Sequence, residues 1–288
     1  MYIQVNGVKL FVETVGAKLG FRGDETIERP TILLLHGGPG LDHSVFRPAF
    51  EPLSEHAQLV MYDHRGSGRS EDGPKSHWHM DQWADDVAGV IETLDLQKPI
   101  VLGTSFGGFV AQRFAAKYPD LLSGLVLMAT TYKPQIEATL EQILLAGGMH
   151  ASAAASDFFT DAERPGVVEK YFETCLQYYA YKGIDAEAMA RIPPRPEVMM
   201  HFFRKSGEMY QCDFSEDLKK INVPTLLLHG EKDVIFPPAL AEETLNLLAA
   251  ERKHLALFKE GGHLLEQDVP DDLVQTITRF FELKLPSG

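Results

Sequence analysis

The sequence predicts an α/β protein: a doubly wound, mostly parallel sheet with an inserted helical cap. Apolar runs typical of buried strands alternate with helical patterns through residues 1–131. No such run occurs in 132–213, where helical patterns dominate, and the alternation resumes in 214–288. We therefore expect a core made of residues 1–131 and 214–288, with a cap at 132–213. A chain of 288 residues is long enough for this arrangement.

The core begins with a predicted hairpin over 2–14, where apolar and polar residues alternate around Asn6-Gly7. Residues 16–29 are rich in glycine and charge, which predicts a surface loop. Continuous apolar runs at 31–35 and 58–62 are typical of strands that are covered on both faces.

The core continues with a helix predicted at about 81–94, for which Asp81 is a plausible N-cap. A strand that ends near Gly103, a helix and a strand over 124–129 follow. After the cap, the sequence predicts strands at 224–229 and 255–258 and a closing amphipathic helix at about 270–284. In the cap it predicts helices near 135–146, 165–182, 185–191 and 197–209, with Gly147-Gly148, Pro165 and the prolines of 193–196 as breakers.

Charge and cysteine content limit the possible partners and compartment. There are 27 Lys and Arg against 41 Asp and Glu, a net charge of −14, which argues against nucleic acid or an anionic membrane as the main partner. Cys175 and Cys212 lie far apart and predict neither a disulfide framework nor a metal site. The first residues do not resemble a secretion signal, and no apolar run is long enough to cross a bilayer. We therefore expect a cytoplasmic protein.

The most informative motif is Gly103-Thr104-Ser105-Phe106-Gly107, between the predicted strand and helix. A G-x-S-x-G turn in that context is a nucleophile elbow, which holds its serine in strained geometry and requires small neighbours. The serine hydroxyl then lies at a helix N-terminus, where free N–H groups favour developing negative charge. Ser105 is the candidate nucleophile.

A serine hydroxyl needs a base, and the base needs a group that orients it. Asp233 is an acid just beyond the strand over 224–229, and His263 follows the strand over 255–258. The order Ser105, Asp233, His263 is the order expected for this elbow. Glu231 is a rival orienting group, although its side chain would leave the strand in a different direction. We predict that the three side chains meet at the carboxyl edge of the sheet.

A second glycine-rich segment is His36-Gly-Gly38-Pro-Gly40, directly after the first buried strand. Backbone N–H groups near Gly38 and the N–H of Phe106 are candidate donors to an oxyanion. The pair His77 and His79 lacks the further ligands of a metal signature, so we expect neither metal nor cofactor.

Together these motifs resemble the α/β-hydrolase family over nearly the whole chain, and its proline iminopeptidase branch in particular. The resemblance rests on His36–Gly40, Asp63-His-Arg-Gly-Ser-Gly-Arg-Ser70, the Ser105 elbow and the contexts of Asp233 and His263. It implies that 36–40 contributes to an oxyanion hole, that 63–70 is a structural turn near the site, and that 132–213 is a cap. It further implies release of an N-terminal residue, often proline, without metal or cofactor.

The sequence departs from that branch in two respects. Phe106 stands where tryptophan is usual, and no specific motif marks the carboxylates that would bind a substrate amine. The acidic candidates in the cap are Glu137, Glu141, Glu169, Glu173, Glu197 and Glu208.

The resulting hypothesis is a serine hydrolase acting through an acyl-enzyme on a small molecule or short peptide. An aminopeptidase for N-terminal proline leads, and a carboxylesterase, lactonase or amino-acid amidase is the alternative. A carbon–carbon hydrolase would share the same machinery, whereas Ser105 argues against reactions that need aspartate at the elbow. An alternative of another class is a small-molecule receptor built on this fold. The substrate-binding residues and the oligomeric state stay open.

Overall fold

The main sheet brings the predicted functional segments together at the carboxyl ends of its parallel strands. The computed structural model describes residues 1–22 and 24–283, and its main sheet has the strand order β1-β2-β6-β5-β7-β8-β9-β10. From β6 to β10 neighbouring strands are parallel, whereas β2 runs antiparallel to β1 and β6. The strands are β1 Tyr2–Val5, β2 Val8–Val15, β5 Thr31–Leu35, β6 Gln58–Tyr62, β7 Ile100–Thr104, β8 Gly124–Met128, β9 Thr225–Gly230 and β10 Lys253–Phe258.

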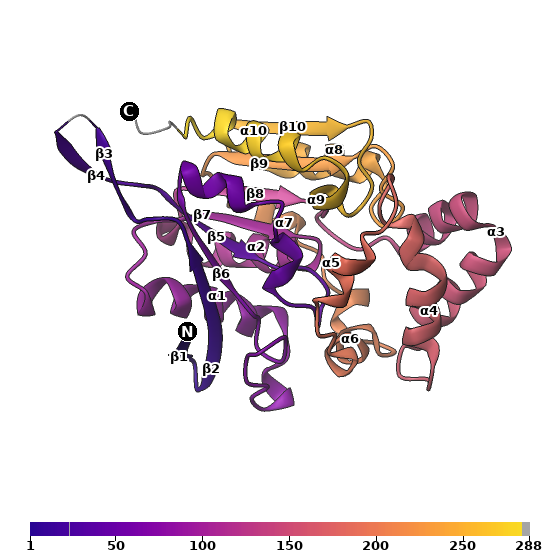
Figure 1. Cartoon of the computed structure of the whole chain (residues 1–288). Coiled ribbons are helices and arrows are strands. Elements are labelled where there is room, and N and C mark those ends of the chain that lie inside the picture. Colours follow the sequence, from indigo (N-terminus) through magenta and orange to yellow (C-terminus); the bar gives the residue numbers. More distant parts are fainter. Residues whose placement is uncertain (23, 284–288) are drawn as a thin grey trace.

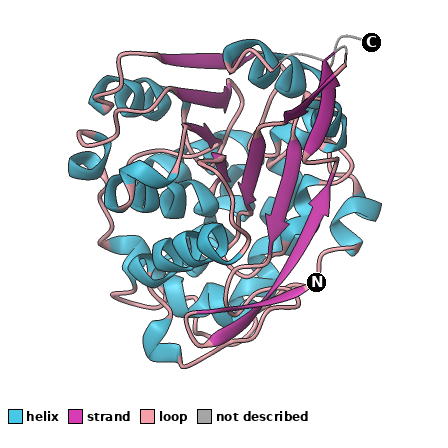
Figure 2. Cartoon of the chain, turned by 90° about the vertical axis from the view of Figure 1, so that its left-hand side faces the viewer, coloured by secondary structure: helices cyan, strands magenta, loops and turns pink. Residues whose placement is uncertain are grey.

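Helices cover both faces of this sheet (Figure 2), which explains why its central strands are continuously apolar. Alternate residues of β5 serve the two faces: Leu33 and Leu35 join one buried cluster, and Ile32 and Leu34 join the other. The first cluster includes residues of α1 and α2, and the second includes residues of α10. The helices of the core are α1 Met80–Thr93, α2 Phe106–Lys117, α7 Ser215–Leu218, α8 Pro238–Leu247, α9 Leu265–Asp268 and α10 Pro270–Phe280.

Residues 132–213 carry four α-helices that gather at one end of the sheet (Figure 1), toward which the arrowheads of β8 and β10 point. They are α3 Ile136–Thr160, α4 Val167–Cys175, α5 Ala186–Ala190 and α6 Pro196–Phe203. A third buried cluster joins three of them, with Ile143 and Phe158 of α3, Tyr171 of α4 and Met199 of α6. This end carries the carboxyl ends of the parallel strands, so the helices stand over the site that the motifs predict.

Two local expectations were wrong. Residues 16–29 form a two-stranded hairpin, β3 Leu19–Arg22 and β4 Glu25–Glu28, instead of the expected surface loop. The side chains of Leu19 and Phe21 are exposed, so this hairpin has no buried face. Its sequence therefore lacks the apolar pattern of a strand and resembles that of a loop. The N-cap of α1 is His79, whose Nδ1 accepts from Gln82 N–H, and Asp81 lies inside the helix.

The break expected at Gly147-Gly148 is present as a kink: Gly148 has non-helical backbone angles (φ 66°, ψ −166°), and the helical residues on either side of it together make up α3. Short 3₁₀ helices occupy His43–Phe46, Glu51–Glu55, Lys75–His77, Pro119–Leu121, Leu176–Tyr178 and Glu208–Tyr210. Cys175 and Cys212 are free thiols. Within the described ranges, we find no helix whose length and apolar character would let it traverse a lipid bilayer.

Candidate active site

Ser105 lies at the turn between β7 and α2, in strained backbone geometry. Its φ of 51° and ψ of −118° fall in a region that residues with side chains rarely adopt. A Cβ at Gly103 would collide with the carbonyl of Gly107, and a Cβ at Gly107 would collide with the carbonyls of Leu35 and His36. The tight packing of β7, α2 and β5 therefore explains why both neighbours of the serine are glycines.

His263 and Asp233 meet Ser105 in one hydrogen-bonded chain. His263 Nε2 lies 3.0 Å from Ser105 Oγ, and its Nδ1 lies 2.9 Å from Asp233 Oδ2. Asp233 follows β9 and His263 follows β10, so the ends of three strands supply the three side chains. The structure thus brings together the three residues that the sequence singles out. Glu231, the rival orienting group, is exposed and makes no side-chain hydrogen bond within the described part of the chain.

The surroundings of Asp233 favour its ionised form. Burial alone would raise the pKa of this carboxyl, but attraction to His263 and hydrogen bonds outweigh burial and lower the pKa below its usual value. The N–H groups of Ile235 and Phe236 donate to its Oδ1 at 2.7 and 2.9 Å. Behind it, burial lowers the pKa of His229, whose Nε2 donates to the Phe236 carbonyl at 2.6 Å. A negative Asp233 can hold Nδ1 of His263 as a donor, which leaves Nε2 free to accept the serine proton.

Hydrogen bonds join the loop that carries His263 to the cap. The sequence did not predict this connection. The N–H groups of His263 and Leu264 donate to the carbonyl of Tyr179, at 2.6 and 3.0 Å. Asp268 bridges the same two segments: its Oδ2 accepts from Gly262 N–H at 2.7 Å and from Tyr181 N–H at 2.8 Å. Its Oδ1 accepts from Lys182 N–H at 2.8 Å. A single buried carboxylate thus joins residues on both sides of the site, and no local motif announces it.

The two predicted oxyanion donors flank Ser105. A Cβ built on Gly37 would lie 3.2 Å from Ser105 Cβ, so the 36–40 segment packs directly against Ser105. Gly38 has a φ of 126°, which favours glycine, and it borders the same cavity as Ser105 and Phe106. Phe106 is the first residue of α2, so its N–H has no acceptor within the helix. Both segments therefore border the space where an oxyanion would form.

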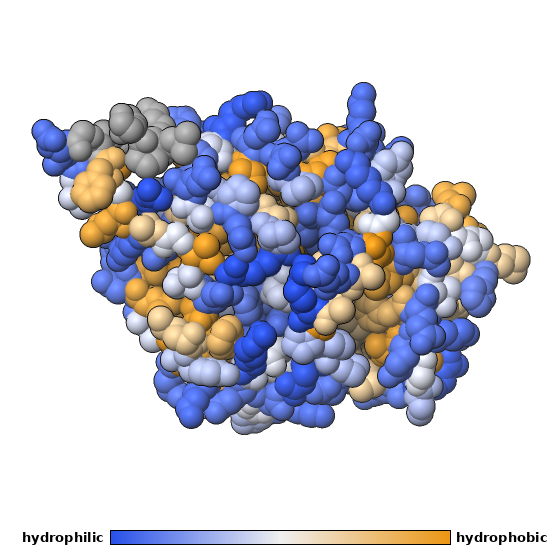
Figure 3. All heavy atoms as spheres, viewed as in Figure 1, coloured by the Kyte–Doolittle hydropathy of each residue, from blue (hydrophilic) through white to orange (hydrophobic). Residues whose placement is uncertain are grey.

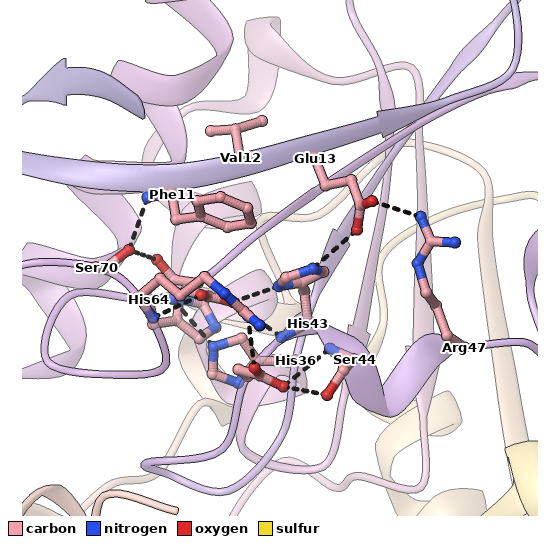
Figure 4. A network of polar contacts seen from close by, with 12 residues as sticks. Phe11, Val12, Glu13, His36, His43, Ser44, Arg47, His64 and Ser70 are labelled. Atoms are coloured by element: carbon pink, nitrogen blue, oxygen red, sulfur yellow. Dashed lines mark hydrogen bonds and ion pairs between the residues drawn. The ribbon is translucent and has the colours of Figure 1, made fainter. Parts of the chain in front are cut away.

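His36, the first residue of the 36–40 segment, lies against a second buried histidine, His64 (Figure 4). His36 Nδ1 donates to the Gly37 carbonyl at 2.8 Å, and His36 Nε2 accepts from His64 N–H at 3.0 Å. These two partners require a neutral His36, and burial lowers its pKa accordingly. Burial also lowers the pKa of His64, whose ring nitrogens have no hydrogen-bond partner among the described residues. The segment with the candidate oxyanion donors thus rests on uncharged imidazoles.

A charged network lies beside them, in the motif at 63–70 (Figure 4). His43 Nδ1 is 2.6 Å from Asp63 Oδ1, and its Nε2 is 2.9 Å from Glu13 Oε2. Burial alone would lower the pKa of His43, but the carboxylates outweigh it and raise the pKa. Arg69 N–H donates to Asp63 Oδ2 at 2.8 Å. This network ties β2, the 42–46 turn and the 63–70 turn together.

Among the described residues, Asp42, His43 and Asp63 have donor atoms close enough to hold a metal ion. Their ligand atoms already have protein partners, however. The Arg69 guanidinium lies 3.2 Å from Asp42 Oδ2, and Ser44 donates to Asp42 Oδ1 from both its N–H and its hydroxyl. A cation here would have to compete with Arg69 and with His43, so the donor set fits an internal ion-pair network better.

A mainly apolar cavity of about 90 Å³ opens above Ser105 and His263. Its polar side chains largely have hydrogen-bond partners already: Tyr171 and Tyr179 hydroxyls lie 2.7 Å apart, and Thr139 donates to the Ile235 carbonyl at 2.7 Å. Of the described residues lining it, none is Asp, Glu, Lys or Arg. The remaining lining residues are Gly38, Leu41, Phe106, Phe109, Pro134, Ile136, Phe158, Phe159, Phe172, Met199, Phe203, Met209 and Phe236.

The candidate cap carboxylates lie elsewhere. Glu197 pairs with Arg195 at 2.6 Å, and Glu208 accepts from Met80 N–H at 2.9 Å. Glu169 and Glu173 border an outer groove, and Glu137 borders a separate surface pocket. A substrate amine held beside Ser105 would therefore meet no carboxylate from the described lining of the inner cavity.

One further acidic group lies near the site. Burial raises the pKa of Glu266 to about 7, and its Oε2 is shielded from solvent without a hydrogen-bond partner among the described residues. Glu266 follows His263 by three residues but borders a different pocket, between Arg47 and Lys182. The sequence did not distinguish it from the other acids of the closing region.

The fold and the residues at this edge define a protein of the α/β hydrolase class, and comparison with known proteins agrees. Residues 30–265 match the family model described as the alpha/beta hydrolase fold, so the chain belongs to that family. It is 28% identical to a proline iminopeptidase, PfmaB, from Pestalotiopsis fici, over 94% of this chain and 99% of that protein. It is 25% identical to a putative carbamate hydrolase, RutD, from Pantoea ananatis, over 86% of this chain and 87% of that protein. Among solved structures, a meta-cleavage product hydrolase from Pseudomonas fluorescens superposes with a TM-score of 0.75 at 22% identity, covering 98% of this chain and 97% of that one.

Proposed function

We propose that this protein is a serine hydrolase that cleaves an ester or amide through an acyl-enzyme, and that the part of the substrate beside the scissile bond is uncharged and apolar. The observation that carries the proposal is the contact of 3.0 Å between Ser105 Oγ and His263 Nε2, with Asp233 behind the imidazole. A hydroxyl, an imidazole and a carboxylate in hydrogen-bonding sequence form the arrangement that activates a serine.

In the proposed reaction, Ser105 Oγ attacks the carbonyl carbon while His263 Nε2 takes the hydroxyl proton. The N–H groups of Phe106 and Gly38 stabilise the oxyanion, and Asp233 offsets the charge of the imidazolium. The carbon–heteroatom bond breaks as His263 returns the proton to the leaving group. Water then adds to the acyl-enzyme with His263 again as base, and the acid and free Ser105 are released.

The nature of the cavity favours a substrate that is uncharged next to the scissile bond. Bringing an ammonium group into an apolar cavity without a counter-charge is costly, and no described lining residue supplies one. Aromatic and aliphatic side chains instead favour an apolar acyl group. An ester, a lactone or a neutral amide meets both conditions.

Release of N-terminal proline is the second candidate, and the likeness to the iminopeptidase PfmaB over almost the whole chain favours it. Such a substrate carries a free amine next to the scissile bond. It would need a carboxylate from the cap to move toward Ser105, because Glu169 and Glu173 border only the outer groove. Phe106 in place of the usual tryptophan also weighs against this candidate.

The first test replaces the nucleophile. We expect Ser105→Ala to abolish turnover and labelling by a fluorophosphonate probe. Its free energy of unfolding should stay within about 1 kcal/mol of the wild type, because alanine adds no volume. A folded wild-type protein that resists labelling would support a receptor on this fold and contradict the hydrolase proposal.

The second test separates the two candidates by a substrate panel. We expect turnover of short aryl esters and lactones to exceed turnover of prolyl and alanyl aryl-amides. Efficient cleavage of the prolyl aryl-amide with slow ester cleavage would reverse the order of the candidates. The predicted cytoplasmic location belongs to this proposal, and fractionation of the native host would test it.

A further inference from the structure

An apolar groove of about 450 Å³ lies directly outside the Ser105 cavity. Leu41, Phe172 and Met199 border both spaces, so the groove adjoins the site of the proposed reaction. The inner cavity alone, at about 90 Å³, is far smaller than the roughly 300–1,000 Å³ of pockets for drug-sized ligands. Together the two spaces reach that range.

Three segments form the groove. They are the 39–41 stretch beside the candidate oxyanion donors, helix α4, and the chain from α5 into α6. Figure 3 shows hydrophobic side chains in a hollow between α4 and the α5–α6 stretch. Arg195 N–H donates to the Gly40 carbonyl at 2.8 Å, which fixes one wall to the core.

Negative charge predominates over positive charge at the rim of the groove. Arg195 is already paired, with Asp72 at 2.8 Å and with Glu197 at 2.6 Å. Glu169 and Glu173 stand one turn apart on α4, and neither has an ion-pair partner among the described residues. A ligand that reaches this rim therefore meets uncompensated negative charge on an otherwise apolar surface.

We propose that this groove is a second substrate subsite, which binds an extended apolar arm ending in a neutral or cationic group. The inference rests on the proposed function, because it assumes that the substrate reacts at Ser105. Burial of the arm supplies affinity in proportion to the apolar surface that it removes from water. Glu169 and Glu173 discriminate against a substrate whose arm ends in a carboxylate.

The first experiment measures kcat/KM for aryl acetates and aryl decanoates, and for aryl-alkyl esters in which the alcohol part is lengthened instead. Leu176→Trp adds bulk to a residue that borders the groove and is absent from the lining of the inner cavity. We expect kcat/KM for the long substrates to fall at least tenfold while kcat/KM for the acetate changes less than twofold. The matched control is Leu145→Trp, at an exposed leucine of α3. Equal losses for long and short substrates would overturn the proposal.

The second experiment does not depend on turnover. Ser105→Ala protein is titrated calorimetrically with decyltrimethylammonium, decanol and decanoate, which share a chain length and differ in end charge. We expect the cation to bind at least tenfold more tightly than the anion, and the added Leu176→Trp change to weaken binding of all three. In Glu169→Gln/Glu173→Gln protein the preference for the cation should shrink, whereas Glu141→Gln on α3 should preserve it.

The two proposals fail in different ways. If no ester is cleaved but the ten-carbon ligands bind and the Leu176→Trp change weakens them, the groove stands and the proposed reaction falls. If esters are cleaved but the ligands do not bind, or bind equally well after the Leu176→Trp change, the subsite is wrong. A decanoate that binds as tightly as the cation would contradict the role of the two glutamates.

Discussion

At the residue scale, the position of the His263 ring depends on groups that hold its backbone as well as on those that contact the ring. Asp233 orients it through Nδ1, but the backbone of His263 is held by Tyr179 and, through Gly262, by Asp268. The sequence predicted the hydroxyl, imidazole and carboxylate, because each follows a predicted strand in the expected order. It did not predict Asp268, because that role exists only once 181–182 and 262 lie together.

We expect Asp268→Asn to slow labelling of Ser105 by a fluorophosphonate about 10- to 100-fold, the cost of a misplaced catalytic group. An asparagine has only one acceptor oxygen, so its amide N–H₂ would face the N–H of Lys182 or those of Gly262 and Tyr181. The measurement is the labelling rate, with thermal unfolding as the check on folding.

The matched control is Asp271→Asn, an exposed carboxylate three residues further on. It should label at the wild-type rate. Asp268→Glu, which keeps two acceptor oxygens, should recover part of the loss. Wild-type labelling by a folded Asp268→Asn variant would show that this carboxylate does not position His263.

At the element scale, strands were predicted well and the cap poorly, for a physical reason. Buried parallel strands are continuous apolar runs whatever their partners, so β5, β6 and β8 were confirmed nearly to the residue. The hairpin of β3 and β4 has exposed side chains and no such run. Which faces of α3, α4 and α6 surround the cavity depends on long-range packing, so the carboxylate-free lining could not be predicted.

The elbow provides the test at this scale. We expect Gly107→Ala to destabilise the protein by about 1–3 kcal/mol and to slow Ser105 labelling, because the new methyl group would push α2 away from the Leu35 and His36 carbonyls. Chemical denaturation and labelling are the two measurements. Gly183→Ala, at a φ of 99° with open space around it, should cost about 1 kcal/mol through backbone strain and leave labelling unchanged. Normal labelling by folded Gly107→Ala protein would contradict this account of the elbow.

At the scale of the whole molecule, buried uncharged histidines make stability depend on pH. Burial lowers the pKa of His36, His64 and His229 in the folded protein. In the unfolded chain such groups titrate near 6.5. Below that pH the unfolded state binds protons that the folded state does not, so the free energy of unfolding falls as the solution becomes acidic. His43, with a raised pKa, has the opposite effect, and its stabilisation is lost as pH rises through its folded-state pKa.

We expect the free energy of unfolding to decrease from pH 7 to pH 5, and His64→Phe to make the decrease shallower by up to about 1.4 kcal/mol per pH unit. Phenylalanine keeps an aromatic ring among Tyr62, Trp83 and Phe106, and it removes two ring nitrogens that lack partners among the described residues. Urea unfolding at several pH values measures the slope. His150→Phe, at an exposed position of α3, should keep the wild-type slope, and equal slopes for His64→Phe and the wild type would refute the assignment.

The hydrogen bonds between Tyr179 and the 263–264 backbone also limit how the molecule can admit a ligand. If the 179–182 stretch swung outward, it would break the hydrogen bonds that hold the backbone of His263. The cap therefore could not open at this point and keep the imidazole in place to accept a proton. A ligand would then have to reach Ser105 past other parts of the cap, with these hydrogen bonds intact. The 179–182 stretch would therefore stay in place while a ligand enters or leaves, and only other parts of the cap would be free to move.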